Sequence, residues 1–332
     1  MQIKVLVNGV GGDVGQGVIK ALKSSSLDIK IYSMCISHSS SWLYKSDNSY
    51  ISPFSNSKEY IPFLIDIINE HKIDVFFPTV DSEILKISQN KREIEEKTGV
   101  KIFVDDSSLV GICDDKYQTI LFLKNNGFDF PQTILASDEN AEKFINNLKT
   151  LPVIKKRRGR GALDVFIKAD DSLIKKYLGN SDYIFQEFLD CDDEYTTGVY
   201  LGDDGEIKGV CTLKRELKCG STYKAERILD EKIEENLKNI AKKLGMKYVN
   251  IQSKRVGDRI FPFEFNGRFS GTTGIISQKV FNAPEIFIKE RFLKMPVEKS
   301  TNRYFFMVMR YLEEVYANEK EIEDLKKRSF GV

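Results

Sequence analysis

The sequence predicts an α/β protein, with a parallel sheet at the N-terminus and an α+β part after it. The first strand-like run, Ile3 to Val7, leads directly into a glycine turn and an amphipathic helix. Apolar runs then alternate with helical patterns to about residue 104, which is typical of a parallel sheet. Beyond residue 110 hairpins and single helices replace this alternation.

Composition excludes several classes of protein. The 332 residues suffice for two or three domains, and 50 basic residues balance 49 acidic ones, which does not indicate a nucleic-acid or membrane partner. Five cysteines without C-x-x-C spacing and only two histidines argue against a disulfide framework, a zinc site or a Ser-His-Asp triad. No signal peptide precedes the first strand and no apolar run approaches ~18 residues, so we expect a soluble cytoplasmic protein.

The glycine turn at residues 8–17, NGVGGDVGQG, allows two interpretations. One is a dinucleotide site with the phosphates at the helix N-terminus. However, the next strand, Ile29 to Met34, ends in Cys-Ile-Ser and lacks the acidic residue that would hold a ribose. The other interpretation is that the glycines let the helix pack closely. A nicotinamide-dependent oxidoreductase therefore stays open as an alternative.

A basic hairpin tip is the first candidate for phosphate binding. The basic residues 155–158 leave an apolar strand, pass through Gly159 and Gly161, and re-enter a strand at 165–167. Glycines let the backbone approach oxygens, and cations neutralise them. The tip therefore indicates a flap over phosphates, with a solvated charged loop as the alternative.

Further elements follow in order along the chain. We expect strands at 183–189, 194–200 and 207–213, a loop at 218–222, a helix at 231–244, a strand-like apolar run at 304–311 and a charged helix at 319–328.

The stretch from Tyr248 to Gly274 reads as a hairpin that carries polar side chains. Glu264 and Asn266 lie two residues apart and so share one face of a strand. A three-residue loop places Gln252 opposite Glu264 and Asn250 opposite Asn266. A two-residue loop sends Gln252 to the other face, and the sequence alone does not choose between them.

In the first register, carboxylate and amide oxygens converge in a set that suits Mg²⁺. Arg268 follows at the end of the strand, within reach of the same place. The alternative is an ordinary solvent-exposed hairpin. Phe263 and Phe265, on either side of Glu264, make that face unusual.

In this order the motifs resemble those of the ATP-grasp superfamily, in particular the branch similar to the carbamoyl-phosphate synthase large chain and, more distantly, D-alanine–D-alanine ligase. The resemblance covers about residues 1 to 300 and rests on five motifs in order. It implies a Rossmann-like domain without nucleotide binding at 1–112 and a small ATP-grasp subdomain with a phosphate flap at 113–190. A C-terminal subdomain with the metal site at 191–300 and a strand with a charged helical tail at 301–332 complete the chain.

The resemblance also implies an ATP site. Asp115-Lys116 matches a pair whose lysine contacts phosphate. The lysine of the strand before the flap matches either Lys155 or Lys156, depending on the end from which the motif is counted. Residues 186–189 match the adenine hinge, and Glu194 the residue that holds the ribose. The residues matched to ATP binding are Lys116, Lys155, Lys156, Gly159, Gly161, Gln186, Glu187, Phe188, Leu189, Glu194 and Lys214.

The same resemblance assigns the catalytic end of the site. Gln252, Glu264 and Asn266 match the Mg²⁺ ligands and Arg268 the catalytic arginine, which favours the three-residue loop. Arg215, or its neighbour Lys214, matches the basic residue at the terminal phosphates. Two features depart from the family: the flap is less rich in serine and glycine, and a glycine replaces proline in E-x-N-P-R.

The implied activity is that of an ATP-dependent carboxylate–amine ligase, or less often a carboxylate–thiol ligase, acting through an acyl phosphate and releasing ADP and phosphate. ATP and Mg²⁺ would be required, two ions being the family pattern and Mn²⁺ an alternative. Offsetting phosphate charge needs no protein nucleophile, which agrees with a chain poor in histidine. A non-catalytic ATP-binding module is the other alternative.

We expect small-molecule carboxylate and amine substrates bound by loops within 37–58, 216–226 and 268–282. A homodimer is a further expectation, in which the apolar run 304–311 serves either the interface or the core.

Overall fold

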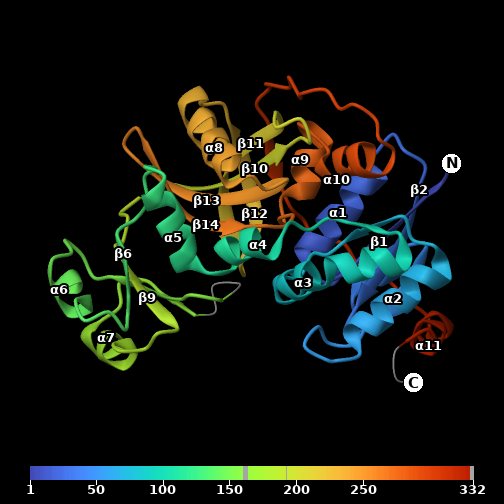
Figure 1. Cartoon of the computed structure of the whole chain (residues 1–332), viewed down its shortest axis with the longest axis horizontal. Helices are drawn as coiled ribbons and strands as arrows, with labels where there is room; N and C mark the ends of the chain where they lie inside the picture. Colours follow the sequence, from blue (N-terminus) through green and yellow to red (C-terminus); the bar gives the residue numbers. More distant parts are fainter. Residues whose placement is uncertain (160–163, 192, 330–332) are drawn as a thin grey trace.

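The computed structural model describes residues 1–159, 164–191 and 193–329, and in these ranges the strands form three sheets. The N-terminal sheet lies at one end of the molecule and the smallest sheet at the other, with the largest sheet between them (Figure 1). Within these ranges no helix combines the length and apolar character needed to cross a bilayer.

The N-terminal sheet has five parallel strands in the order β3-β2-β1-β4-β5. The prediction of a parallel α/β sheet is therefore confirmed, and the third strand in the chain was not foreseen. The strands are β1 (Ile3–Val7), β2 (Ile29–Cys35), β3 (Asn48–Ile51), β4 (Val75–Phe77) and β5 (Lys101–Ile102). The helices among them are α1 (Asp13–Lys23), η1 (Ser41–Lys45), α2 (Tyr60–His71) and α3 (Asp81–Thr98).

Two helices connect this unit to a small antiparallel sheet, whose strands run in the order β6-β9-β7-β8. Its strands are β6 (Thr133–Leu135), β7 (Val153–Lys156), β8 (Val165–Phe166) and β9 (Tyr183–Gln186). The helices of this region are α4 (Ser107–Asp114), α5 (Lys116–Asn125), α6 (Ala141–Asn146) and α7 (Asp171–Tyr177).

The largest sheet is antiparallel, with strands in the order β14-β13-β10-β11-β12-β15. Its strands are β10 (Glu194–Leu201), β11 (Ile207–Lys218), β12 (Ser221–Ile228), β13 (Tyr248–Val256), β14 (Arg259–Asn266) and β15 (Met307–Met309). The remaining helices are α8 (Glu231–Leu244), α9 (Thr273–Lys279), α10 (Ala283–Phe287), η2 (Ile288–Phe292) and α11 (Glu319–Lys327). The apolar stripe of α8 covers one face of the sheet, and Gly245 ends the helix in a left-handed conformation.

The expected loop at 218–222 is instead a tight hairpin. Cys219 and Gly220 form a two-residue turn between β11 and β12, with φ of 51° and 78°. Positive φ at both positions is the geometry of a type I′ turn, which matches the twist of the flanking strands. The sequence gives little warning, because cysteine is uncommon at the first position of such a turn.

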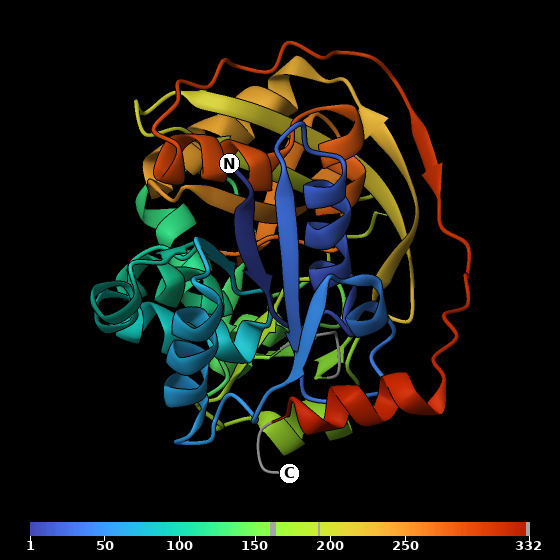
Figure 2. The same cartoon turned by 90° about the vertical axis from the view of Figure 1, so that its right-hand side faces the viewer.

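The C-terminal segment forms less regular structure than expected. Only Met307–Met309 of the run 304–311 forms a strand, and it pairs with β12 at the edge of the largest sheet. The chain then runs along the outside of the molecule to α11, which lies against the N-terminal domain (Figure 2). Leu325 anchors this helix because its side chain is buried in the N-terminal core.

Aromatic side chains join the N-terminal sheet to the largest sheet. Phe103, just after β5, stacks on Phe269 with ring centres 4.0 Å apart and meets Phe287 edge-on at 5.0 Å. Tyr248 of β13 contacts Phe269 at 5.1 Å. Because Phe269 follows Arg268 directly, this cluster fixes the end of the predicted catalytic segment against the N-terminal domain.

Candidate active site

The hairpin β13–β14 has the register that places Gln252 opposite Glu264, but its turn is not the one that was expected to produce this register. Gln252 pairs with Glu264 and Asn250 with Asn266. The expectation of a three-residue loop is wrong, since Val256 pairs with Arg259 across a two-residue turn. A β-bulge compensates for the shorter turn.

The bulge lies at Phe263, because Gln252 pairs with Glu264 while the next residue, Ser253, pairs with Pro262. The extra residue changes which positions face each side of the sheet. Phe263 and Glu264 therefore both line the cavity next to the sheet, and Phe265 packs against α5 on the other side.

A cavity of about 860 Å³ lies where the three sheets meet. It reaches from the hinge after β9, past the β13–β14 hairpin, to the beginning of α1 and α3. The predicted site residues that line it are Lys116, Lys155, Lys156, Gly159, Gln186, Glu187, Phe188, Leu189, Glu194, Arg215, Gln252, Glu264, Asn266 and Arg268. Gly161 lies outside the described residues.

Two lysines stand near the acidic end of the hairpin. Lys116, at the start of α5, has its Nζ 3.8 Å from Glu264 and donates to the carbonyl of Gly159 at 3.0 Å. Lys155 on β7 donates to Gln186 Oε1 at 2.8 Å and lies over the ring of Phe263, 4.5 Å from its centre. Burial lowers the pKa of Lys155 to about 8.

The hinge after β9 borders the apolar part of the cavity. Glu187 is held by Gln132, which accepts its backbone N–H at 2.8 Å and donates a backbone N–H to its carboxylate at 2.7 Å. Phe188 is flanked by Lys168 and Lys254, whose Nζ atoms lie 4.6 and 5.6 Å from the ring centre. This wall offers flat apolar surface and backbone groups to a planar ligand.

Arg215 connects the hinge side with the hairpin. Its guanidinium donates to Glu194 Oε1 at 2.6 and 3.0 Å and to Gln252 Oε1 at 2.9 Å. Lys214, proposed with it for phosphate binding, faces the other side of β11, where its Nζ lies 2.5 Å from Asp193. Strand alternation separates the two neighbours, so only Arg215 lines the cavity.

Arg268 is held by a residue from the N-terminal domain. Its Nε lies 2.5 Å from Asp81 Oδ1 and its Nη2 2.9 Å from Asp81 Oδ2, a two-point contact with the first residue of α3. Nη1 donates to the carbonyl of Phe269 at 2.8 Å. The guanidinium is therefore fixed at the cavity wall.

The oxygen donors of the hairpin fit a magnesium ion bound together with phosphates. No three His, Cys, Asp or Glu side chains form a metal cluster within the described ranges, so a cation here depends on Glu264 and on amide oxygens. Mg²⁺ is commonly held in this way, with substrate phosphates completing its shell. The buried Asn266 Nδ2 has no hydrogen-bond partner in the described structure, which leaves that amide uncommitted to structural bonds.

Comparisons with known proteins agree with this geometry. Residues 5–103 match the family described as PylC-like, N-terminal domain. The α-aminoadipate–LysW ligase LysX of Sulfurisphaera tokodaii is 28% identical over 153 residues, which are 42% of this chain and 53% of that protein. The match thus spans about half the length of this curated relative.

Solved structures match nearly the whole chain. N5-carboxyaminoimidazole synthetase from Staphylococcus aureus, complexed with ADP, superposes with a TM-score of 0.73 at 14% identity, over 94% of this chain and 83% of the other. The biotin carboxylase domain of Hydrogenobacter thermophilus 2-oxoglutarate carboxylase, with MgADP and bicarbonate, gives 0.68 at 14% identity, over 86% and 69%. The protein has the ATP-grasp fold.

Within this ATP-grasp fold, the cavity includes residues that sequence reasoning did not select. Asp13, Asp81 and Asp114 line its N-terminal end. Residues 37–58, expected in the acceptor pocket, do not line it, whereas parts of 216–226 and 268–282 do. In the sequence, these acidic residues near helix ends could have indicated a binding site, but helix capping explains their positions equally well.

The glycine turn at residues 8–17 is packed rather than open. The side chains of Val80 and Thr79 occupy the space beside Gly9, and a Cβ on Gly15 would lie 2.7 Å from the carbonyl of Gly9. A Cβ on Gly274 of α9 would lie 2.9 Å from the carbonyl of Gly17. These glycines therefore serve close packing, including the contact of α1 with α9.

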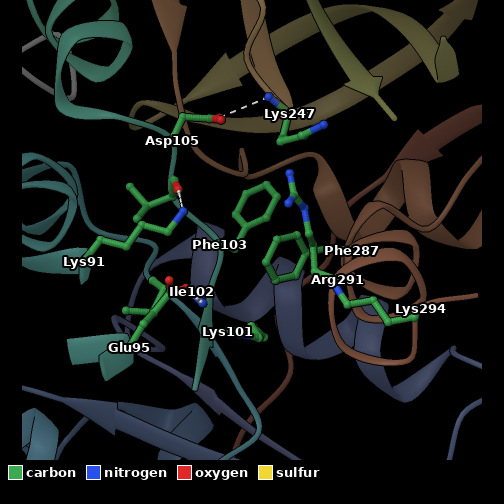
Figure 3. Close-up of a pocket in the computed structure, with 11 residues that line it drawn as sticks. Lys91, Glu95, Lys101, Ile102, Phe103, Asp105, Lys247, Phe287, Arg291 and Lys294 are labelled. Carbon is green, nitrogen blue, oxygen red and sulfur yellow. Dashed lines mark hydrogen bonds between the residues drawn. The ribbon is translucent and has the colours of Figure 1, made fainter. Parts of the chain in front are cut away.

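A second, smaller cavity of about 190 Å³ lies between the N-terminal domain and the largest sheet (Figure 3). Lys247 donates its backbone N–H to Asp105 at 3.1 Å, and Lys91 donates to the carbonyl of Val104 at 2.7 Å. Burial raises the pKa of Asp105 to about 6. Its volume is below the range typical of sites for drug-sized ligands, so the larger cavity is the nucleotide candidate.

Proposed function

We propose that the protein is an ATP- and Mg²⁺-dependent carboxylate–amine ligase, with a thiol as the less common acceptor. The γ-phosphate of ATP passes to a carboxylate oxygen, ADP leaves, and the amine then displaces phosphate from the acyl phosphate. Both substrates are small molecules in this proposal, and two metal ions, with Mn²⁺ as a substitute, are its cofactor requirement. The cytoplasm, where ATP is abundant, is the proposed location.

One observation carries the proposal: the oxygens of Gln252, Glu264 and Asn266 share a cavity with Lys116 and Lys155. Phosphoryl transfer requires positioning and neutralisation of charge more than any protein nucleophile. A cavity with oxygen donors for a cation and lysines for phosphates supplies both. Adenine binding alone requires neither, so a non-catalytic ATP-binding module explains the site less well.

Each wall of the cavity has a separate task in this proposal. The hinge at 186–189 holds the base, and Lys116 and Lys155 bind phosphate oxygens. Glu264, with the amide oxygens of Gln252 and Asn266, would hold Mg²⁺, which supplies neutralisation of phosphate charge when bound.

Arg268 stabilises the developing acyl phosphate, and Asp81 orients its guanidinium for that task. The cavity excludes water from the acyl phosphate, which would otherwise hydrolyse.

The relatives support this chemistry. The curated relative is named a ligase, and the two solved structures contain ADP and MgADP. The identities are low and the curated match is partial, so the particular carboxylate and amine are not carried over. The packed glycine turn also disfavours the alternative of a nicotinamide-dependent oxidoreductase, because it leaves little room for a pyrophosphate.

The test compares Glu264→Gln with Glu206→Gln, a matched substitution at an exposed residue of the β10–β11 turn. Phosphate release is measured with pooled carboxylates and pooled amines, and thermal stabilisation by MgATP and by NAD(H) is measured in parallel. We expect Glu264→Gln to lower turnover by at least ~100-fold and the control to change it little. Normal turnover in Glu264→Gln, or stabilisation by NAD(H) and not by MgATP, would contradict the proposal.

A further inference from the structure

The smaller cavity, between the N-terminal domain and the largest sheet, carries five cationic side chains from separate parts of the chain. They are Lys91 of α3, Lys101 of β5, Lys247 just before β13, Arg291 of η2 and Lys294 two residues after η2. In Figure 3 they surround the rings of Phe103 and Phe287. Cations that converge on one cavity from distant segments raise the local concentration of anions, so the cavity is a candidate anion site.

The positive charge of this cavity exceeds the negative charge around it. Glu95 and Asp105 also line the cavity, and each carboxylate accepts a backbone N–H at 3.1 Å. Asp203 lies beside the lining, 2.7 Å from the Nζ of Lys247 and 2.9 Å from a guanidinium nitrogen of Arg291. With all of these groups ionised, five cations against three carboxylates leave an excess of two positive charges. A bound dianion would balance this excess.

The ammonium groups of Lys101 and Lys294 have no hydrogen bond or ion pair with any residue that the structure describes. Lys91, by contrast, donates to the carbonyl of Val104 at 2.7 Å. Lys101 is nevertheless half-buried, and a charge withdrawn from water costs free energy unless a counter-charge meets it. An anion in the cavity would supply that counter-charge.

The backbone at the same place has an uncommon conformation. Arg291 lies in η2, which is π-helical, a rare form that occurs frequently at functional sites. Lys294 has a φ of 57°, a left-handed conformation that is usually taken by glycine at the end of a helix and is costly for a lysine. Because glycine would fit this position better, the lysine indicates a role for its side chain.

We propose that this cavity is a binding site for a phosphate group, with inorganic phosphate as its ligand, and that the bound phosphate joins the N-terminal domain to the largest sheet. The ammonium groups of Lys101 and Lys294 would donate to its oxygens, and the planar guanidinium of Arg291 suits the same oxyanion. The volume of about 190 Å³ corresponds to about six water molecules of ~30 Å³ each, which admits a phosphate and excludes a nucleotide. The site is independent of the proposed ligase activity.

The test follows thermal unfolding of the full chain at pH 7.5 in roughly 1 to 50 mM sodium phosphate, with sodium chloride of equal ionic strength as the reference. An anion that binds only the folded chain raises the unfolding temperature with its concentration, and this dependence gives the dissociation constant. We expect phosphate to stabilise the native chain more than chloride does. Lys101→Gln and Lys294→Gly should each weaken phosphate binding by ~10-fold or more, because each removes a charge-assisted hydrogen bond.

Matched variants separate binding from folding. Lys294→Gly relieves the left-handed backbone, so without phosphate it should be at least as stable as the native chain. Lys72→Gly is its control, because Lys72 ends α2 with a φ of 51° and does not line the cavity. It should keep the native affinity for phosphate. Lys155→Met removes a lysine of the larger cavity and should also keep this affinity.

Glycerol 3-phosphate distinguishes free phosphate from the phosphate group of a small metabolite. We expect it to bind more weakly, because the cavity is small, and tighter binding would overturn the choice of inorganic phosphate. Three results would overturn the site itself: no stabilisation by phosphate beyond that by chloride, native affinity in both Lys101→Gln and Lys294→Gly, or loss of the phosphate effect in Lys72→Gly or Lys155→Met.

Discussion

The affinity for nucleotide should depend on the protonation of Lys155. Burial lowers the pKa of this lysine to about 8, with the nearby Lys116 lowering it further and Glu264 opposing the shift. The lysine is therefore charged below about pH 8 and neutral above it. Bound phosphates favour the charged form, so nucleotide binding raises its pKa.

The direction and size of the effect follow from this linkage. Affinity is highest and constant below about pH 8, and it is lost as the pH rises through that value, by up to tenfold per pH unit. Between pH 7.5 and 9.5 the dissociation constant should rise by about 20-fold, or about 1.8 kcal/mol. That loss lies within the range expected for a hydrogen bond to a charged group.

The assay is titration calorimetry with MgADP at several pH values from 7.5 to 9.5, where the phosphates of ADP are already ionised. Lys155→Met should bind at least about 20-fold more weakly at pH 7.5 and should show little further loss at pH 9.5. Lys156→Met is the matched control and should keep the native pH dependence. An unchanged pH dependence in Lys155→Met, or its loss in Lys156→Met, would refute the assignment of the phosphate contact to Lys155.

Two further predictions concern the junction between the N-terminal domain and the largest sheet. Ionising Asp105 costs the folded protein stability, because its pKa is raised to about 6, so stability falls as the pH rises from about 4 through 6. Asp105→Asn should remove this loss. Measured by urea unfolding, it should raise the free energy of unfolding by about 1–2 kcal/mol at pH 7.5 but by little at pH 4.5. Equal gains at both pH values would contradict this prediction. Phe103→Ala should destabilise the protein by about 3–5 kcal/mol in the same assay, because it removes the ring between Phe269 and Phe287; a loss below about 1 kcal/mol would show that the cluster does not join the domains.

Patterns in the sequence were sufficient for the parallel sheet and for the 14 predicted site residues that line the cavity. The helix at 231–244 was foreseen because an apolar stripe runs along it and Gly245 ends it, and the structure adds a side-chain cap from Asp230. Lys116, Lys155 and Glu264 were foreseen because each lies in a short motif whose order along the chain could be compared with a family.

Features that depend on distant packing were not predictable. The pairing of Gln252 with Glu264 was expected, but from a longer turn, whereas the structure reaches it through the bulge at Phe263. That bulge places Phe263 beneath Lys155, a residue from another sheet, and no local pattern specifies such a contact. The pair Arg268–Asp81 joins residues 187 positions apart and escaped detection for the same reason.

The glycine turn makes packing contacts that extend to the wall of the large cavity. It packs against the loop before α3, and Gly17 allows α1 to approach Gly274 of α9 closely. The start of α3 supplies Asp81, which holds Arg268, and the segment before α9 lines the cavity. The glycines that first suggested a nucleotide site in the N-terminal domain therefore act at a distance, because their close packing positions the arginine and the loop at the proposed catalytic end of the large cavity.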